Sequence, residues 1–192
     1  EILHPSIRAT LQYMKFSDEF GLEIHHQSDL PARSGIGSSS TFIVGLVKAL
    51  SALNKVLIHP YDLAKQAIFI EQDIMNEPVG SQDQIAAAYG GFNLIHFLNN
   101  NKSEQNFIVR RNIISRDRVR LLEQNLILLY TGTSRLSSKI SKDVVNNIKV
   151  NNHILEQMYS LVDHSINILR NGVMNDFGHL LNIGWQLKKQ LS

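Results

Sequence analysis

Cysteine is absent from the 192 residues, and no long apolar run is present either. The first absence excludes disulfide frameworks, thiolate zinc sites and cysteine nucleophiles. The second argues against a transmembrane helix, which needs about 20 apolar residues. The net charge is also low, with a formal value of +2. This is too small for a protein that binds nucleic acid by neutralising its phosphates. We therefore expect no nucleic-acid or membrane partner. The lack of cysteine fits a reducing compartment, and we expect a cytoplasmic location.

The composition that remains is that of an ordinary globular protein, with 43% hydrophobic and 19% charged residues. The length suits one large domain or two small ones. The chain begins with Glu1 rather than methionine and stops at Ser192 while a helical pattern is still running. We therefore expect it to be a piece of a longer protein.

Periodicity and turn residues predict an α+β fold rather than a regular strand–helix alternation, because helices and strands mix first and helices alone follow. The expected helices are residues 5–20, 41–53, 61–76, 82–89, 136–150, 153–171 and 175–191. The expected strands are residues 22–26, 92–98, 105–110 and 125–131. The last strand contains the apolar run Leu126–Tyr130, which predicts a central strand covered on both faces.

A glycine turn leads directly into the helix expected from Thr41. Gly35 and Gly37 allow positive φ and a close approach of ligand to backbone. The serines that follow favour a helix start, where free N–H groups and the helix dipole attract anions. We interpret the segment as a cradle for nucleotide phosphates, although it is not a Walker A loop, because glycine rather than lysine precedes Ser38. The alternative is a plain glycine turn into a capped helix.

A phosphate cradle without lysine needs another source of positive charge, and Mg²⁺ held by one or two protein oxygens is the usual one. The candidate ligands are Ser39 and a carboxylate. Glu71 lies on an otherwise apolar helix face, and Asp83 lies between glutamines in a segment of small residues that a substrate can approach closely. The alternatives are a solvated helix residue for Glu71 and, for Asp83, an acid at a helix N-terminus that the dipole favours.

Taken together, these motifs resemble the GHMP kinase family. Residues 31–40, which read PARSGIGSSS, resemble its central phosphate loop, and Glu71 followed by residues 78–84 (PVGSQDQ) resembles its acidic element. Residues 78–93 and 129–135 are similar to the branch of the family that phosphorylates D-glycero-D-manno-heptose 7-phosphate. The family's N-terminal sugar-holding motif and its C-terminal glycine-rich motif are absent, so the chain resembles the middle of such a kinase.

The resemblance implies an ATP site built on the loop. The residues implied for binding ATP are Pro31, Ser34, Gly35, Ile36, Gly37, Ser38, Ser39 and Ser40. Ser39 and Glu71 would bind Mg²⁺, and Asp83 would orient the sugar hydroxyl and accept its proton. Arg135 would be the second catalytic residue, as a cationic partner of Asp83 or of the transferring phosphoryl group. The alternative for Arg135 is a surface arginine.

The resemblance also implies a fold and a domain organisation. Residues 1–131 would be the remainder of the N-terminal ATP-binding domain, similar to the ribosomal protein S5 domain 2-like fold but without its first strands. Residues 132–192 would be the truncated, helical start of the C-terminal GHMP kinase domain.

The activity that the resemblance implies is transfer of the γ-phosphate of ATP to the anomeric hydroxyl of D-glycero-D-manno-heptose 7-phosphate. The product would be the 1,7-bisphosphate, for nucleotide-activated heptose and surface polysaccharide. The partner is thus a small-molecule sugar phosphate, and a homodimer is compatible with this activity. Two alternatives stay open: another GHMP sugar 1-kinase such as a fucokinase, and a non-catalytic fragment that only binds nucleotide.

Residues 110–120 are rich in arginine. We favour a solvated loop for this stretch over a patch that binds the distal phosphate of the substrate.

Overall fold

The computed structural model describes residues 2–16, 21–29, 35–98, 106–130, 132 and 151–191. Contacts divide the chain into two compact units. Unit 1 holds the described residues up to Gly90 together with Tyr130 and Gly132, and unit 2 holds residues 91–129 and 151–191. The predicted domain boundary at residue 131 stays a prediction. None of the described helices is long and apolar enough to cross a membrane.

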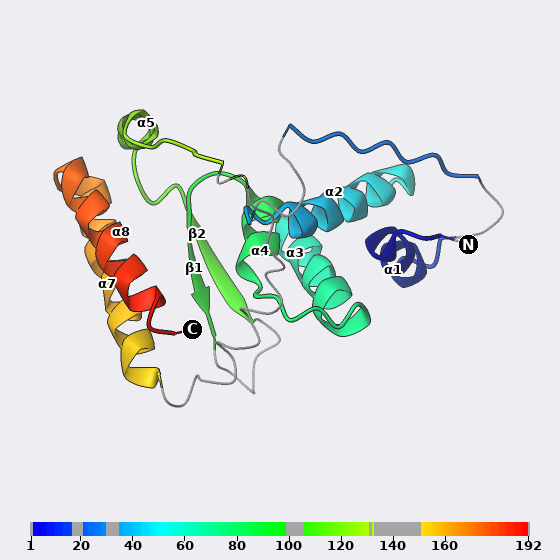
Figure 1. The fold of residues 1–192 in the computed structure, drawn as a ribbon. Coiled ribbons are helices and arrows are strands. Elements are labelled where there is room, and N and C mark those ends of the chain that lie inside the picture. Colours follow the sequence, from blue (N-terminus) through cyan, green and yellow to red (C-terminus); the bar gives the residue numbers. More distant parts are fainter. Residues whose placement is uncertain are drawn as a thin grey trace. The chain divides into compact units, whose positions relative to one another are not determined.

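Unit 1 is helical (Figure 1). Its elements are α1 (Pro5–Tyr13), α2 (Ser38–Leu53), α3 (Pro60–Phe69), the π-helical turn η1 (Ile70–Ile74) and α4 (Gln82–Tyr89). The first four elements bury one apolar core, formed by Ala9, Ile43, Val44, Val47, Leu63, Ala67 and Ile70. Helix α4 packs against α2 and α3. This packing brings the start of α2, the turn η1 and the start of α4 into one region.

The described part of unit 2 combines a hairpin with the helices α5, α7 and α8 (Figure 1). Strands β1 (Asn93–Phe97) and β2 (Phe107–Arg111) are antiparallel, with Ile95 opposite Val109. The helices are α5 (Arg116–Gln124), α7 (Asn152–Asn171) and α8 (Met174–Lys188), and α7 packs against α8. The α+β class is therefore confirmed.

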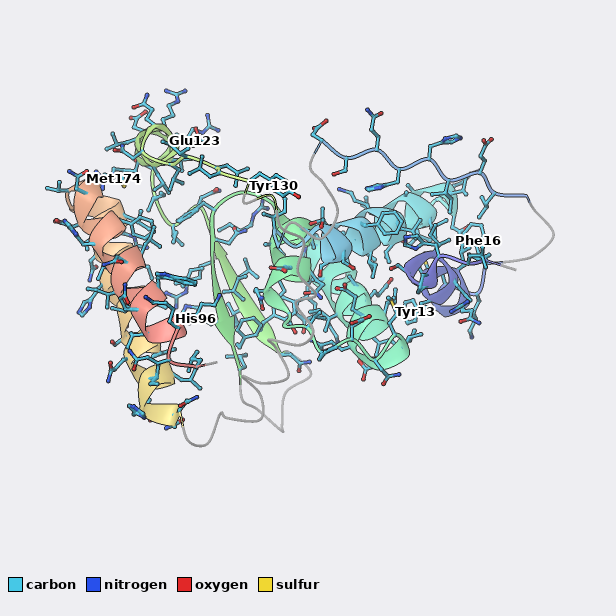
Figure 2. All side chains as sticks on the ribbon, viewed as in Figure 1. Tyr13, Phe16, His96, Glu123, Tyr130 and Met174 are labelled. Carbon is cyan, nitrogen blue, oxygen red and sulfur yellow. The ribbon has the colours of Figure 1, made fainter. Side chains whose placement is uncertain are left out.

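Several predicted elements are confirmed with shifted ends. Helix α2 begins at Ser38 rather than Thr41, because the glycine turn ends at Gly37. Helix α1 ends at Tyr13, whose ring contacts that of Phe69 at 5.6 Å (Tyr13 in Figure 2), and Lys15 takes a positive φ of 51°. Helix α4 and the strands β1 and β2 lie where the pattern placed them, as do α7 and α8. The helix predicted at 136–150 lies outside the described residues.

Two predicted strands are wrong. Residues 22–26 pair with no strand among the described residues, and the ring of His26 instead contacts Phe42 of α2 at 4.8 Å. Residues 125–130 are likewise not a strand, and the apolar run Leu126–Tyr130 is 55 to 85% exposed instead of covered. Figure 2 labels Glu123, near the end of α5, and Tyr130, where the run ends. An apolar run favours a strand, but a strand also needs a neighbouring strand to pair with its N–H and C=O groups.

The loop predicted over residues 110–120 is wrong for most of its arginines, because Arg110 and Arg111 end β2 and residues 116–124 form α5. The hydroxyl of Ser115 accepts a hydrogen bond from the backbone N–H of Arg118 at 3.3 Å and so caps α5. The Arg118 guanidinium donates from Nε to the Leu169 carbonyl at 2.7 Å and from Nη2 to the Ile168 and Gly172 carbonyls, both at 2.8 Å. This arginine therefore donates to three carbonyls at the C-terminal end of α7, one of which, that of Ile168, also accepts from the Gly172 N–H at 2.7 Å.

We expect Arg118→Met to lower the free energy of unfolding by roughly 2 kcal/mol, because three part-buried carbonyls lose a charged donor. The measurement is urea unfolding. Arg120→Met in the same helix is the control, since the ion pair of Arg120 with Asp117 spans 3.7 Å between largely exposed side chains. Such pairs contribute little, so its stability should stay within about 0.5 kcal/mol of the wild type. Equal losses in the two variants would contradict the capping role.

Candidate active site

The glycine turn before α2 has the positive φ values that the sequence predicted. Gly35 and Gly37 have φ values of 79° and 75°, and the ψ of 22° at Gly37 places it in the left-handed region. The first helical hydrogen bond runs from the Thr41 N–H to the Gly37 carbonyl at 2.9 Å. Because the N-cap residue is glycine, no side chain at that position caps the N–H groups of residues 38–40. These groups can therefore bind an anion.

Glu71 lies within the π-helical turn η1. The Met75 N–H donates to the Ile70 carbonyl at 2.9 Å, which is the wider hydrogen-bond spacing of a π-helix. Such turns occur frequently at functional sites. The Glu71 side chain is 1% exposed, so the interpretation of Glu71 as a solvated helix residue is wrong.

A hydrogen-bonded chain joins α2, η1 and α4. The Ser39 hydroxyl donates to Oε1 of Glu71 at 3.3 Å, and the Gln84 amide nitrogen donates to Oε2 of the same carboxylate. Gln84 is completely buried, and its amide oxygen has no hydrogen-bond partner among the described residues. Both predicted metal ligands are thus in contact, and a buried amide fixes the second of them.

Asp83 lies against the glycine turn. A β-carbon added at Gly37 would stand 2.9 Å from the Asp83 Cγ and 3.0 Å from its Oδ2. Asp83 is also in the first turn of α4, so the favourable helix dipole applies to it as well. The contact with Gly37 places this carboxylate beside the N–H groups of α2. A carboxylate in this position can accept a proton from a hydroxyl that approaches a bound phosphate.

The segment between the two carboxylates is held by Gln72. Its amide nitrogen donates to the Val79 carbonyl at 2.8 Å and to the Ser81 hydroxyl at 3.2 Å. The Glu77 N–H donates to the Glu71 carbonyl at 2.9 Å. The sequence analysis assigned no role to Gln72 or Gln84. Glutamines next to both carboxylates were the signal available for them.

Part of the chain matches a known protein family. Residues 5–91, which contain α1, α2, α3, η1 and α4, match the family described as the GHMP kinases N terminal domain. This part of the chain belongs to the GHMP kinases. The family match thus covers unit 1 almost completely, including Gly37, Ser39, Glu71, Asp83 and Gln84.

Three proteins to which the chain is similar are named as kinases of sugars. It is 32% identical over 172 residues to the D-glycero-alpha-D-manno-heptose 7-phosphate kinase of Campylobacter jejuni, covering 88% of this chain and 49% of that protein. It is 25% identical to the bifunctional fucokinase/GDP-fucose pyrophosphorylase of Arabidopsis thaliana, covering 92% and 17%. It is 28% identical to the galactokinase of Pyrococcus furiosus, covering 60% and 30%. The chain therefore spans about half or less of the length of these relatives.

The donor set in this GHMP kinase domain fits magnesium. Mg²⁺ prefers hard oxygen ligands and usually keeps several waters, with only one or two protein ligands besides phosphate oxygens. The Ser39 hydroxyl and the Glu71 carboxylate are such ligands and lie within hydrogen-bond distance of each other. The described residues contain no group of three or more His, Asp or Glu side chains that could hold a metal ion. A site completed by phosphate oxygens does not require one.

Some of the remaining predicted site residues lie outside the described part of the chain, and the others lie at the glycine turn and the start of α2. Pro31, Ser34 and Arg135 lie outside the described residues, so their roles stay predictions. Ile36 is 48% exposed at the turn, whereas the Ser40 side chain is buried in α2. Ser40 can therefore contribute its backbone N–H to the cradle, whereas its side chain is buried.

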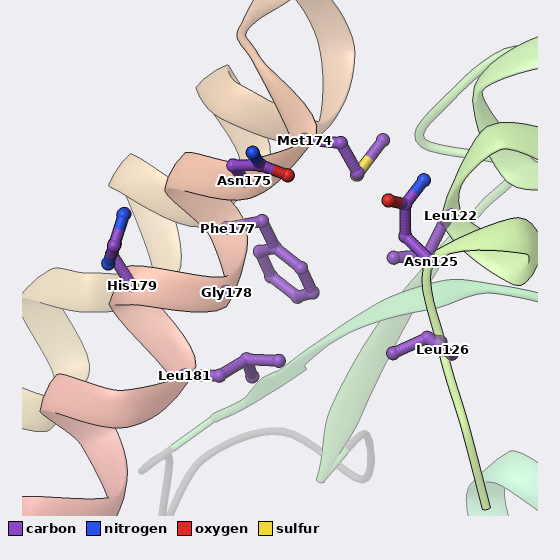
Figure 3. Close-up of a pocket in the computed structure, with 9 residues that line it drawn as sticks. All are labelled: Leu122, Asn125, Leu126, Met174, Asn175, Phe177, Gly178, His179 and Leu181. Atoms are coloured by element: carbon purple, nitrogen blue, oxygen red, sulfur yellow. The ribbon is translucent and has the colours of Figure 1, made fainter.

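A separate pocket of about 350 Å³ lies in unit 2, between the end of α5 and the first turns of α8 (Figure 3). Its lining is mainly apolar and includes Phe177 and Leu181, with polar atoms from Asn125, Asn175 and His179. It contains no carboxylate and none of the predicted site residues. We therefore assign it no part in phosphate transfer.

Proposed function

We propose that this chain carries the phosphate-binding and acidic residues of an ATP- and Mg²⁺-dependent sugar kinase. The observation that carries the proposal is the convergence of Ser39, Glu71 and Asp83 at the start of α2. Ser39 and Glu71 are 32 positions apart yet share a hydrogen bond, and Asp83 touches Gly37. A plain glycine turn into a helix needs neither carboxylate.

The mechanism follows from these positions. The N–H groups of residues 38–40 would donate to the phosphates of ATP, with the helix dipole adding to the attraction. Ser39 and Glu71 would hold Mg²⁺, which neutralises charge on the β- and γ-phosphates when bound. Asp83 would orient the anomeric hydroxyl of the sugar and accept the hydroxyl proton. The sugar oxygen would then form a bond to the γ-phosphorus while the bond between that phosphorus and ADP breaks. Arg135 would balance the charge of Asp83 or of the transferring group.

For the substrate we propose D-glycero-D-manno-heptose 7-phosphate, with the 1,7-bisphosphate as product. The support is the identity of 32% over 88% of the chain to a kinase named for that sugar. In this proposal the product feeds nucleotide-activated heptose and surface polysaccharide, and the enzyme acts in the cytoplasm as a homodimer. The proposal also includes the S5 domain 2-like fold for residues 1–131 and the start of the C-terminal kinase domain at residue 132.

A fucokinase-like sugar 1-kinase is the second candidate, because similarity to the Arabidopsis bifunctional protein extends over 92% of the chain. The third is a chain that binds nucleotide without turnover. The first test is ADP release from ATP and Mg²⁺ with a panel of heptose 7-phosphate, fucose and galactose. We expect heptose 7-phosphate to exceed the other sugars in kcat/KM by at least about 100-fold, because a site that hydrogen-bonds a polar group discriminates strongly against substrates that lack it.

Each other outcome contradicts part of the proposal. A preference for fucose selects the fucokinase-like function. Binding of ATP and Mg²⁺ in a calorimeter without turnover of any sugar selects the non-catalytic alternative. Equal turnover of all three sugars contradicts the substrate proposal but leaves the kinase.

A further inference from the structure

We propose that Gln84 is a positioning residue of the divalent-cation site, which fixes the Glu71 carboxylate in the orientation that faces Ser39. The inference rests on the proposed function in one respect, that Glu71 binds a cation beside phosphate. Beyond the proposed function, the inference assigns a positioning role to Gln84 and to its amide nitrogen.

The first argument is geometric. A carboxylate has two acceptor oxygens, and hydrogen bonds to both of them fix the orientation of the group. In Glu71 the oxygen Oε2 accepts a hydrogen bond from the Gln84 amide, and the oxygen Oε1 accepts one from the Ser39 hydroxyl. Gln84 comes from α4 and Glu71 from η1, so a tertiary contact, not the local turn, sets the orientation of the carboxylate.

The second argument concerns burial. Gln84 is 0% exposed and Glu71 is 1% exposed. A buried carboxylate is costly unless it is hydrogen-bonded or paired with a cation. Glu71 makes no ion pair with a lysine or arginine in the described part of the chain, so an amide donor and a hydroxyl are the partners that the fold provides. Neither partner brings a positive charge, so the positive charge that a buried carboxylate requires is left for a bound cation to supply.

The third argument is the unpaired atom. In the described part of unit 1, the Gln84 amide oxygen is the one buried side-chain oxygen or nitrogen without a hydrogen-bond partner. Buried polar atoms without a partner are uncommon, and each needs an explanation. An acceptor in this place suits a proton donor that arrives with the ligand, such as a water on the bound cation.

The test is binding of Mn²⁺ in the presence of a non-hydrolysable ATP analogue, followed by electron paramagnetic resonance. Gln84→Met keeps the length of the side chain but removes the donor and the acceptor. We expect its Mn²⁺ affinity to fall at least about 10-fold, as is usual when a residue that orients a metal ligand is removed. Affinity for the nucleotide analogue without metal should stay within about two-fold, because the N–H groups of α2 are untouched.

The matched controls are two other glutamines. Gln82→Met changes an exposed residue at the first position of the same helix, and we expect Mn²⁺ affinity to be unchanged. Gln72→Met removes the amide that holds residues 79 and 81, a structural contact that does not touch the carboxylate of Glu71. If Gln84→Met binds Mn²⁺ as tightly as wild type, or if Gln82→Met loses as much affinity, the positioning role is refuted.

A double variant keeps the test decisive if Gln84→Met fails to fold. Glu71→Gln combined with Gln84→Glu preserves the net charge, the volume and an amide–carboxylate hydrogen bond, but moves the carboxylate from η1 to α4. We expect normal folding and at least about a 10-fold loss of Mn²⁺ affinity, whereas retained affinity would overturn the proposal. Binding is measured without turnover, so absence of sugar phosphorylation would refute the proposed function alone.

Discussion

Asp83→Asn is expected to lower sugar phosphorylation roughly 100- to 10,000-fold, the range that a general base contributes. An amide at this position still fills the space beside Gly37 but cannot accept the proton of the sugar hydroxyl. ATP affinity should change by no more than about two-fold, because the phosphates bind the N–H groups of α2. The measurements are kcat by coupled ADP release and ATP affinity by calorimetry.

The control for this prediction is Asp73→Asn. Asp73 lies in η1, two residues after Glu71, and is exposed, so its replacement removes the same charge without removing a group at the start of α2. We expect its kcat to equal that of the wild type. Near-normal turnover in Asp83→Asn would show that Asp83 does not accept the proton.

Gly37→Ala is the second change with a large expected effect, because two costs coincide there. An alanine must adopt φ near 75°, which costs about 1–2 kcal/mol for a residue with a β-carbon. Its β-carbon would also stand 2.9 Å from the Asp83 Cγ, so the carboxylate has to move away from α2. We expect a loss of at least about 100-fold in kcat, since small displacements of a positioned group are costly.

Two other glycines separate these costs. Gly35→Ala has a positive φ of 79° but nothing within 4 Å of the added carbon, so it should lose stability like Gly37→Ala but keep most of its activity. Gly45→Ala lies inside α2 with open space around it and should gain up to about 1 kcal/mol, as helix propensity predicts. Thermal unfolding and kcat, measured on all three variants, check the series. Equal activity of the Gly35 and Gly37 variants would contradict the role of the Asp83 contact.

The elements that local patterns place correctly are those with strong local signals. Helix α4 ends where Gly90 and Gly91 take positive φ, and α2 begins directly after Gly37. The strands β1 and β2 also lie close to their predicted ranges. The run Leu126–Tyr130 was predicted as a buried strand and is exposed, because its coverage depends on neighbouring strands rather than on the run itself. Helix α5 was missed because its arginines gave the segment the appearance of a solvated loop.

The features of the candidate site can also be separated into those that the sequence predicted and those that the tertiary structure decided. Residue order alone was sufficient to identify the glycine turn, the serines behind it, and Glu71 and Asp83 as candidates, because backbone freedom, N-capping and charge are local properties. Tertiary packing decided that Glu71 is buried, that Gln84 holds it toward Ser39, and that Asp83 touches Gly37. These contacts join α2, η1 and α4 across long sequence separations. Such contacts depend on how the helices pack around the shared core, and no local pattern specifies that packing.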